Sequence, residues 1–503
     1  MGATISEADG PVSRAGMVVA VLAFAGIVVS IMQTLVVPMI PQLPTLLHTS
    51  ASNTSWVITA TLLAGAAATP VLGRLGDMYG RRRILLFCLG SLVAGSVICA
   101  LSGSLIPMVV GRALQGAAGG VIPLGISIMR DELPAEKLGS AMGLMSASLG
   151  VGAALGLPGA AVLIEHANWH VLFWFSAGLG VVAAVLVLAA VPESPVRTGG
   201  RFDLLGGAGL SAGLICLLLA ISKGADWGWG SGTTLGLFAT AVLILLLWGW
   251  WELRVPQPLV DLRTTARPQV LITNVASIAV GFGMFAMSLV LPQLLQMPAA
   301  TGYGLGQSML VAGLCMAPGG LMMMAISPLA ARLSAKWGPK VSLMSGALVI
   351  AAGYGLGVGL MGAIWQVVVF SCVISAGVGF AFAAMPALIT SAVPASETAA
   401  ANSLNSLMRS IGTSTASAVV GVVLANMTTR FGSQALPSHD GFRVAVLIGG
   451  GAALVGFLIA AFIPRRRRMA AVVGEPAATT SVTGEPALVG GMPVGRHAGA
   501  EED

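Results

Sequence analysis

The chain has 503 residues, of which 56% are hydrophobic and only 9% are charged. Soluble domains carry roughly a quarter charged residues, so this composition excludes an ordinary soluble protein and makes lipid the expected solvent. The net charge of +6 is spread over short loops and forms no single patch, which argues against a nucleic-acid partner.

Apolar runs long enough to cross a membrane follow one another along the chain. A span needs about twenty apolar residues. Fourteen such runs occur, near residues 16–40, 54–72, 84–103, 106–129, 139–164, 170–191, 204–222, 233–251, 269–296, 306–330, 341–361, 365–391, 399–425 and 442–463. The first run has no small-residue cleavage site in a fitting place, so we interpret it as a membrane helix and not as a signal peptide.

Basic residues between the runs predict the orientation of the spans. With a cytoplasmic N-terminus, twenty Lys and Arg residues fall in cytoplasmic loops and tails, and three fall outside, namely Lys223, Arg430 and Arg443. This asymmetry follows the positive-inside rule. We therefore predict an all-α integral membrane protein with cytoplasmic N and C termini, placed as a multi-pass protein in a bacterial plasma membrane.

A charged segment occurs twice in the chain. "TPVLGRLGDMYGRRRIL" begins at Thr69 after span two, and "SPLAARLSAKWGPKVSL" begins at Ser327 after span ten, with an offset of 258 residues and no gap. A second pair, "LPAEKLGSAMG" from Leu133 and "VPASETAAANS" from Val393, leads into spans five and thirteen. Spans one to six therefore repeat as spans nine to fourteen, with spans seven and eight inserted between them.

The repeat predicts how the chain is divided. Two parallel six-span repeats are a transporter plan, with the substrate path between the halves. The predicted parts are a cytoplasmic tail at 1–15, a six-helix bundle at 16–195, two additional helices at 196–262, a second six-helix bundle at 263–463 and a disordered cytoplasmic tail at 464–503.

Several motifs point to one family. "GRLGDMYGRRR" resembles the signature loop of the major facilitator superfamily, and the two extra central spans are similar to its fourteen-helix drug:proton antiporter branch. "WVITATLLAGAAATP" from Trp56 and "GRALQGAAGG" from Gly111 resemble that branch's second and fourth spans. The resemblance covers about residues 20–463. It implies an exporter of amphipathic small molecules that works by alternating access, is driven by a proton gradient and needs no cofactor.

The signature loop has a physical reading of its own. Gly73 permits close approach of a neighbouring helix, and Gly80 permits a tight turn. Asp77 is an acid that suits the N-terminus of a partner helix, where the dipole favours negative charge. Ala335 stands at the matching position of the second copy, so any ionic contact made by Asp77 is expected on one side only.

The resemblance assigns partners to this loop. In the family, the loop acid contacts the first turn of the fifth span of the other half, which here starts near Thr398. A loop arginine pairs with an acid at the end of the fourth span, which implies Arg81 with Asp131 or its neighbour Glu132. The set would form a cytoplasmic latch. The alternative is that the loop arginines only hold the loop inside the cell.

Arg112 lies within span four. Insertion of an arginine at the centre of a membrane helix costs about 2.5–3.5 kcal/mol. Gln115 follows it as in the family's fourth-span motif, which is implicated in proton movement; structural pairing is the alternative. The aspartate that the branch carries in span one is replaced by Met32, beside Gln33. Because no acid falls in the middle of a span, proton coupling is expected to use a span-end acid, with Asp131 and Glu165 as candidates.

Polar and methionine side chains suggest a substrate cavity. Asn402, Asn405 and Arg409 share one face of span thirteen, where they either line the path or bond neighbouring helices. Asn274 adds an amide in span nine, and Gln33 one in span one. Met284 belongs to a group of methionines in spans nine and ten that either adapt to varied ligands or fill the core.

Span five carries packing signals and a departure from the family. Gly152 and Gly156 form a GxxxG pair for close helix packing. Pro158 is displaced by one position from the antiporter motif, and the paired glycines of that motif are alanines here, which weakens the inference to antiport.

Functions other than drug export make different demands on the sequence. An exporter of lipid or of an endogenous metabolite would share the fold. A membrane sensor or scaffold would need a folded appended domain, which the short tails do not offer. An enzyme is not expected because the chain has no Ser-His-Asp set, HExxH motif or metal-ligand cluster. The expected partners are a small amphipathic substrate and the bilayer, and the expected state is a monomer.

Overall fold

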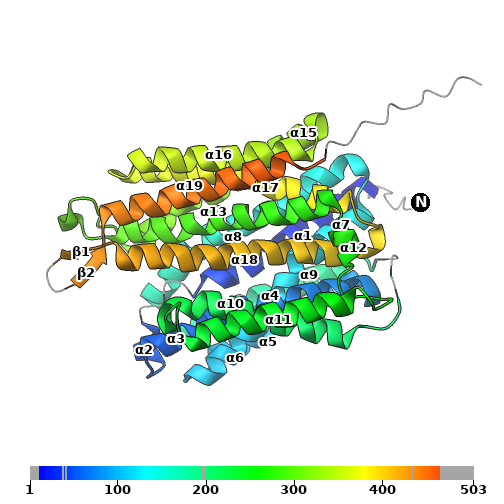
Figure 1. Ribbon diagram of the computed structural model, residues 1–503, viewed down its shortest axis with the longest axis horizontal. Coiled ribbons are helices and arrows are strands. Elements are labelled where there is room, and N and C mark those ends of the chain that lie inside the picture. The colour runs from blue at the N-terminus through cyan, green and yellow to red at the C-terminus, as the bar shows by residue number, and fades with distance from the viewer. Residues whose placement is uncertain are drawn as a thin grey trace, which may run out of the picture. The chain divides into compact units, whose positions relative to one another are not determined.

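The computed structural model describes residues 11–36, 39, 42–194, 197, 199–431 and 434–464 (Figure 1). Of the two predicted tails, at 1–15 and 464–503, only residues 11–15 and 464 belong to the described part. Residues up to Pro464 belong to one compact unit, to which everything below refers.

The described residues contain fourteen helical segments long and apolar enough to span a membrane, which confirms the predicted number. In the first half the elements are α1 (Pro11–Thr34), α2 (Leu43–Leu46), α3 (Ala51–Thr54), α4 (Trp56–Tyr79), α5 (Arg81–Leu101), α6 (Leu105–Gly116), the 3-10 turn η2 (Ala117–Gly120), α7 (Val121–Glu132), α8 (Ala135–His166) and α9 (His170–Ala190). The two inserted helices are α10 (Leu204–Trp227) and α11 (Gly232–Glu252).

The second half repeats the pattern with additions at its loops. Its elements are α12 (Leu262–Thr265), α13 (Pro268–Gln296), the turn η3 (Ala299–Thr301), α14 (Met309–Ala325), α15 (Ser327–Trp337), α16 (Pro339–Gly359), α17 (Ile364–Thr390), the turn η4 (Ala395–Glu397), α18 (Thr398–Asn426) and α19 (His439–Ala461). A hairpin of β1 (Thr428–Phe431) and β2 (Gln434–Pro437) joins α18 to α19, and its antiparallel register pairs Thr428 with Pro437. The all-α prediction missed this hairpin.

The two charged hinges are helical, whereas the sequence predicted loops. Helix α4 continues seven residues beyond the predicted limit to Tyr79, and α15 carries span ten on to Trp337. Only one glycine separates each hinge from the next helix. Gly80 has φ +116° and Gly338 has φ +93°, backbone conformations that L residues with a Cβ rarely adopt.

The interior is built from separate apolar clusters. One cluster is formed mainly by α1, α5, α7, α8 and α9, and a larger one mainly by α13, α14 and α16 to α19. Helix α10 of the insert packs on α4 and α18 through a third cluster that includes Leu63, Leu214 and Leu404. The predicted boundaries between the bundles stay a prediction.

Contacts between the two repeats involve a few helix pairs. Helix α4 packs against α18, and α8 packs against α14 and α17. Figure 1 shows α7 and α12 near one end of α18 and the β1–β2 hairpin at the other. We call these the hinge end and the hairpin end.

Candidate functional site

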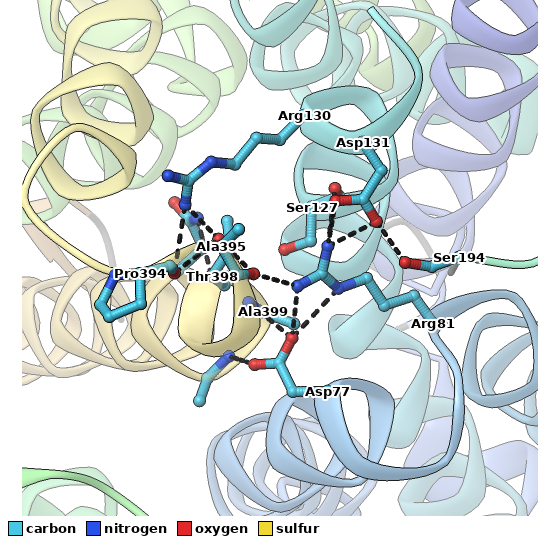
Figure 2. A network of polar contacts seen from close by, with 12 residues as sticks. Asp77, Arg81, Ser127, Arg130, Asp131, Ser194, Pro394, Ala395, Thr398 and Ala399 are labelled. Carbon is cyan, nitrogen blue, oxygen red and sulfur yellow. Dashed lines mark hydrogen bonds and ion pairs between the residues drawn. The ribbon is translucent and has the colours of Figure 1, made fainter. Parts of the chain in front are cut away.

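Asp77, Arg81 and Asp131 form an ionic network at the hinge end, here called the Arg81 network (Figure 2). The Arg81 guanidinium donates from Nη2 to Asp77 Oδ1 at 2.8 Å and from Nη1 to Asp131 Oδ2 at 2.6 Å. Asp77 and Arg81 are completely buried. Removal of one of these charged side chains would leave an uncompensated charge in the interior. The network joins the end of α4, the start of α5 and the end of α7.

The network crosses to the other half of the molecule. The backbone N–H groups of Ala400 and Ala399 donate to Asp77 at 2.9 and 3.3 Å, and Arg81 Nη2 donates to the carbonyl of Ala395 at 2.5 Å. The first N–H groups of a helix have no partner within it and carry the positive end of its dipole. The contact expected between Asp77 and the start of span thirteen is therefore present, while its role in gating stays a prediction.

Two glycines make this arrangement possible. A Cβ on Gly73 would lie 2.7 Å from Ser403 Cβ and 2.8 Å from the carbonyl oxygen of Ala399, so α4 and α18 touch here through a bare backbone. A Cβ on Gly80 would lie 2.6 Å from a carboxylate oxygen of Glu193. Both positions behave as the sequence predicted, because each requires the absence of a side chain.

Arg130 adds a second bridge between the halves that the sequence reading missed. Its guanidinium donates to the hydroxyl of Thr398 and to the carbonyls of Val393 and Pro394 at 3.2 and 3.3 Å. Ser194 donates to Asp131 (Figure 2). The signal was that Arg130 stands next to Asp131 at the end of span four, whereas from the sequence we assigned a contact to Asp131 alone and used Arg130 only for the orientation of the spans.

The second hinge is held differently. Ala335 offers no acid, and Lys340 donates to the carbonyls of Ala461 and Ile463 at 2.7 and 2.6 Å. These bonds join the start of α16 to the end of α19, both within the second half. In the described residues the carboxylate contact to a helix start of the opposite half thus occurs only at the first hinge.

Arg112 lies in a second polar cluster within the first half. Its side chain is almost fully buried, and it donates to the carbonyl of Val57 at 3.2 Å, to Gln115 Oε1 at 2.8 Å and to the carbonyl of Met32 at 3.4 Å. Gln115 in turn donates to Ser96 at 2.7 Å. Within the described residues no carboxylate forms an ion pair with Arg112.

Met32 of α1 occupies the position at which the drug:proton antiporter branch carries its aspartate. The sulfur of Met32 lies 3.4 Å from Arg112 Nη1, so the residue matched to that aspartate does face the arginine. Its neighbour Gln33 is exposed. The two predicted members of this region, Gln33 and Arg112, are therefore not brought together by a hydrogen bond.

The polar face of α18 bonds to its own half. Asn405 donates to Asn274 Oδ1 at 2.9 Å and to Ser277 at 2.7 Å, both on α13, and accepts from Arg409 at 3.1 Å. Asn402 donates to the carbonyl of Thr398 at 2.9 Å. In this structure Asn405 bonds a neighbouring helix, while the lining of a substrate path by these residues stays a prediction. The half-buried Arg409 guanidinium lies over the ring of Phe382.

The glycines of span five serve close packing, as predicted. A Cβ on Gly152 would lie 2.4 Å from Ser30 Cβ, and a Cβ on Gly156 would lie 1.9 Å from Thr34 Oγ1, so both face α1. Pro158 faces α14, where Gly313 leaves room for its ring.

The remaining candidates lie apart from these clusters. Met284 is half-buried and packs on the apolar cluster of the second half. The side chain of Glu165 lies outside the described part of the structure. Two cavities of about 440 and 390 Å³ are lined by other residues, one at the hairpin end between α13 and α18 and one at the hinge end. Among the described residues no group of three potential ligands could hold a metal ion.

Comparisons with known proteins agree with this geometry. The family model described as Major Facilitator Superfamily matches residues 22–417 and 277–489. The chain is 25% identical to "Multidrug resistance protein 3" of Bacillus subtilis over 75% of this chain and 73% of that protein. It is 28% identical to the "Tetracenomycin C resistance and export protein" of Streptomyces glaucescens over 76% and 70%.

A solved structure shows the same fold. The human organic anion transporter MFSD10 (TETRAN) superposes with a TM-score of 0.63 at 15% identity, covering 89% of this chain and 99% of that one. The family match spans well over half of the chain, and the helices, the hinge and the close contacts of α4 with α18 fit it. The chain therefore belongs to the major facilitator superfamily and is a multi-pass membrane transporter, not an enzyme.

Proposed function

We propose that the protein exports amphipathic small molecules, including drugs or antibiotics, by alternating access across a bacterial plasma membrane. The observation that carries this proposal is the asymmetry of the two ends. The Arg81 network ties α4 of one half to α18 of the other at the hinge end. At the hairpin end, the far ends of α13 and α18 line an open cavity of about 440 Å³. All residues that line this cavity belong to the second half, and we propose that it opens onto the path between the halves while the hinge end is closed.

The chemistry of that cavity suits an amphipathic compound. Its lining is mostly apolar, with a few neutral polar groups that can orient a ligand by hydrogen bonds, and no charged side chain. The lining residues are Leu289, Gln293, Ser417, Val420, Gly421, Leu424, Ala425, Thr428 and Pro437.

The names of the relatives support export of foreign or toxic compounds. Two relatives that are 25% and 28% identical to this chain over the aligned residues are named for multidrug resistance and for tetracenomycin C resistance and export. We extend that activity to this chain, together with the hinge-end gate, a proton gradient as the energy source, and Asp131 or Glu165 as the coupling acid. The hinge end is then the cytoplasmic end, with both termini in the cytoplasm.

A transport assay tests the proposal directly. The chain is expressed in a bacterial host stripped of its own pumps, and accumulation of a broad panel of amphipathic dyes and antibiotics is compared with that in cells carrying an empty vector. We expect lower accumulation of several unrelated compounds, abolished by a protonophore. Unchanged accumulation of every compound, with the protein present in the membrane, would contradict drug export.

Export of a self-made compound is the second candidate, because the Streptomyces glaucescens relative is named for both resistance and export. The two are separated by deleting the gene in its own host. Accumulation of an endogenous lipid or metabolite in the deletion strain, without a change in drug susceptibility, would favour this second function.

A further inference from the structure

Glu252 is a buried acid that the mechanism above does not use. It ends α11, is 2% exposed, and accepts one hydrogen bond at Oε1 from the backbone N–H of Val260 at 2.7 Å. Its other oxygen, Oε2, is buried with no hydrogen-bond partner. A bare carboxylate oxygen in the interior is costly, which raises the question of what it binds.

Asp203 supplies the answer, because its carboxylate converges on the same point. A Cβ on Gly206 would lie 2.4 Å from Asp203 Oδ2 and 2.8 Å from Glu252 Oε2. We propose that Asp203 and Glu252 form a proton-binding site, in which a proton on Glu252 Oε2 makes a hydrogen bond to Asp203 Oδ2. Loss of this proton then loosens the hinge end.

The hydrogen bonds decide which acid carries the proton. Asp203 caps α10 by accepting from the N–H of Gly206 at 2.8 Å, and it accepts from Trp251 Nε1 at 3.1 Å. Both oxygens of Asp203 therefore accept hydrogen bonds, whereas Oε2 of Glu252 has no donor. A carboxylate whose two oxygens both accept hydrogen bonds keeps its charge more easily, so we place the proton on Glu252. Two carboxylate oxygens have no attraction for each other unless one of them is protonated.

No ion pair within the described part of the chain offsets a second negative charge on these two acids, although three arginines lie around the adjoining cavity. In the described residues no Lys or Arg forms an ion pair with Asp203 or Glu252. The charged groups that line the adjoining cavity of about 390 Å³ are Arg74 of α4, Arg254, Asp261 and Arg263 of the segment after α11, and Glu397 before α18. Although its partial burial works the other way, hydrogen bonds from Thr264 and from the N–H of Arg263 hold the pKa of Asp261 below its ordinary value, so this neighbour adds negative charge.

The site is linked to the hinge through the segment that Glu252 anchors. Leu259 and Val260 are buried, and they pack in one apolar cluster with Leu63 of α4 and Leu404 of α18. Without the proton, repulsion between the two buried carboxylates would move Glu252 away from Asp203, and the segment bonded to Glu252 through Val260 would shift with it. Since the same cluster supports the contact of α4 with α18, we expect deprotonation at high pH to favour separation of the hinge end.

Infrared spectroscopy of the full chain in lipid tests the proton site. We expect the wild type to show a protonated-carboxyl C=O band that disappears in Glu252→Gln and remains in the exposed control Glu136→Gln. Asp203→Asn provides a second variant, because asparagine preserves the helix cap and its amide stabilises an ionised Glu252, so the band should also disappear. A band unchanged in both site variants would overturn the proposal.

Distance measurements test the link to the hinge. Spin labels are placed through Tyr79→Cys and Ser396→Cys in a background free of native cysteines. With Glu252 intact, we expect a longer-distance population to grow as pH rises, and with Glu252→Gln we expect no such pH response. The same pH response in both would refute the link. The proton site and its link to the hinge stand by themselves, and only their effect on transport rests on the proposed function. Neither readout needs a transported compound, so failure of drug export would leave both results standing.

Discussion

At the scale of single residues, buried charge is placed where a partner helix can receive it. Asp77 could be assigned from the sequence because an acid beside a turn suits a helix start, and the N–H groups of Ala399 and Ala400 occupy that place. Arg130 could not, because its acceptors Thr398, Val393 and Pro394 lie more than 260 residues away along the chain.

Neutralising Asp77 tests the hinge-end gate. Asp77→Asn weakens charged hydrogen bonds to Arg81 and to the start of α18, each worth about 1.5–3 kcal/mol. We expect transport to fall by about tenfold or more, since about 1.4 kcal/mol is a factor of ten, while membrane insertion stays normal. The measurement is efflux per inserted molecule. Asp440→Asn, an exposed acid at the hairpin end, is the matched control, and wild-type efflux by Asp77→Asn would show that the network does not gate.

Met32 offers a gain-of-function test. Its sulfur faces the guanidinium of Arg112 at 3.4 Å, so Met32→Asp would place a carboxylate beside a buried cation that has no ion-pair partner in the described residues. We expect this variant to improve transport of cationic compounds relative to neutral ones, because a cation entering a low-dielectric site needs a paired negative group. The neighbouring variant Gln33→Asp serves as control. Equal effects of the two variants on cation transport would contradict a specific role for the position facing Arg112.

At the scale of elements, hydropathy located the helices but not their ends. The apolar run of span two stops near Leu72, yet α4 continues to Tyr79 because Asp77 finds partners on α18 and Arg81. Hydropathy ends a predicted span at its first polar residues, because it does not register the partners that neutralise them in the folded protein. The β1–β2 hairpin escaped prediction because its strands are only four residues each and follow the end of a membrane helix directly.

Close packing of α8 on α1 gives a test at this scale. A Cβ on Gly152 would lie 2.7 Å from the backbone oxygen of Ile27, which cannot move without shifting α1, whereas a Cβ on Gly159 meets nothing within 4 Å. Overpacking of this kind costs about 1–3 kcal/mol. We therefore expect Gly152→Ala to lower the thermal unfolding temperature in detergent and Gly159→Ala to leave it nearly unchanged. Equal stability of the two variants would contradict this packing.

At the scale of the whole molecule, the two repeats share a plan but not their charges. The hinge helices α4 and α15 each pack against the fifth span of the other half, α18 and α8 respectively. Only the first hinge carries the acid. Arg112 and Arg409, one in each half, form no ion pair with an acid in the described residues.

These two embedded cations lead to a prediction about substrate charge. We expect neutral or weakly anionic amphipaths to be transported better than permanent dications, because the spans offer positive groups and amides but no carboxylate near their middle. The measurement is uptake into proteoliposomes, with an imposed pH gradient, of a dication and a neutral compound of similar size. Faster gradient-driven uptake of the dication would refute the prediction.

The sequence by itself determined the solvent, the fourteen spans, the internal repeat and the family. These follow from local information, because a helix in lipid satisfies its backbone hydrogen bonds internally and so each span must be apolar over its own length. The roles of the glycines at 73, 80, 152 and 156 could also be predicted, because a residue without a side chain permits close approach of helices or a tight turn.

Only the tertiary structure decided which side chains meet. The bridge from Arg130 to Thr398, the bonding of Asn405 to α13 and the convergence of Asp203 with Glu252 join residues between 49 and 268 positions apart in the chain. Such pairs depend on how the helices are packed and rotated. Hydropathy carries little of that information in lipid, because small residues and buried polar contacts, rather than apolar surface, hold membrane helices against one another.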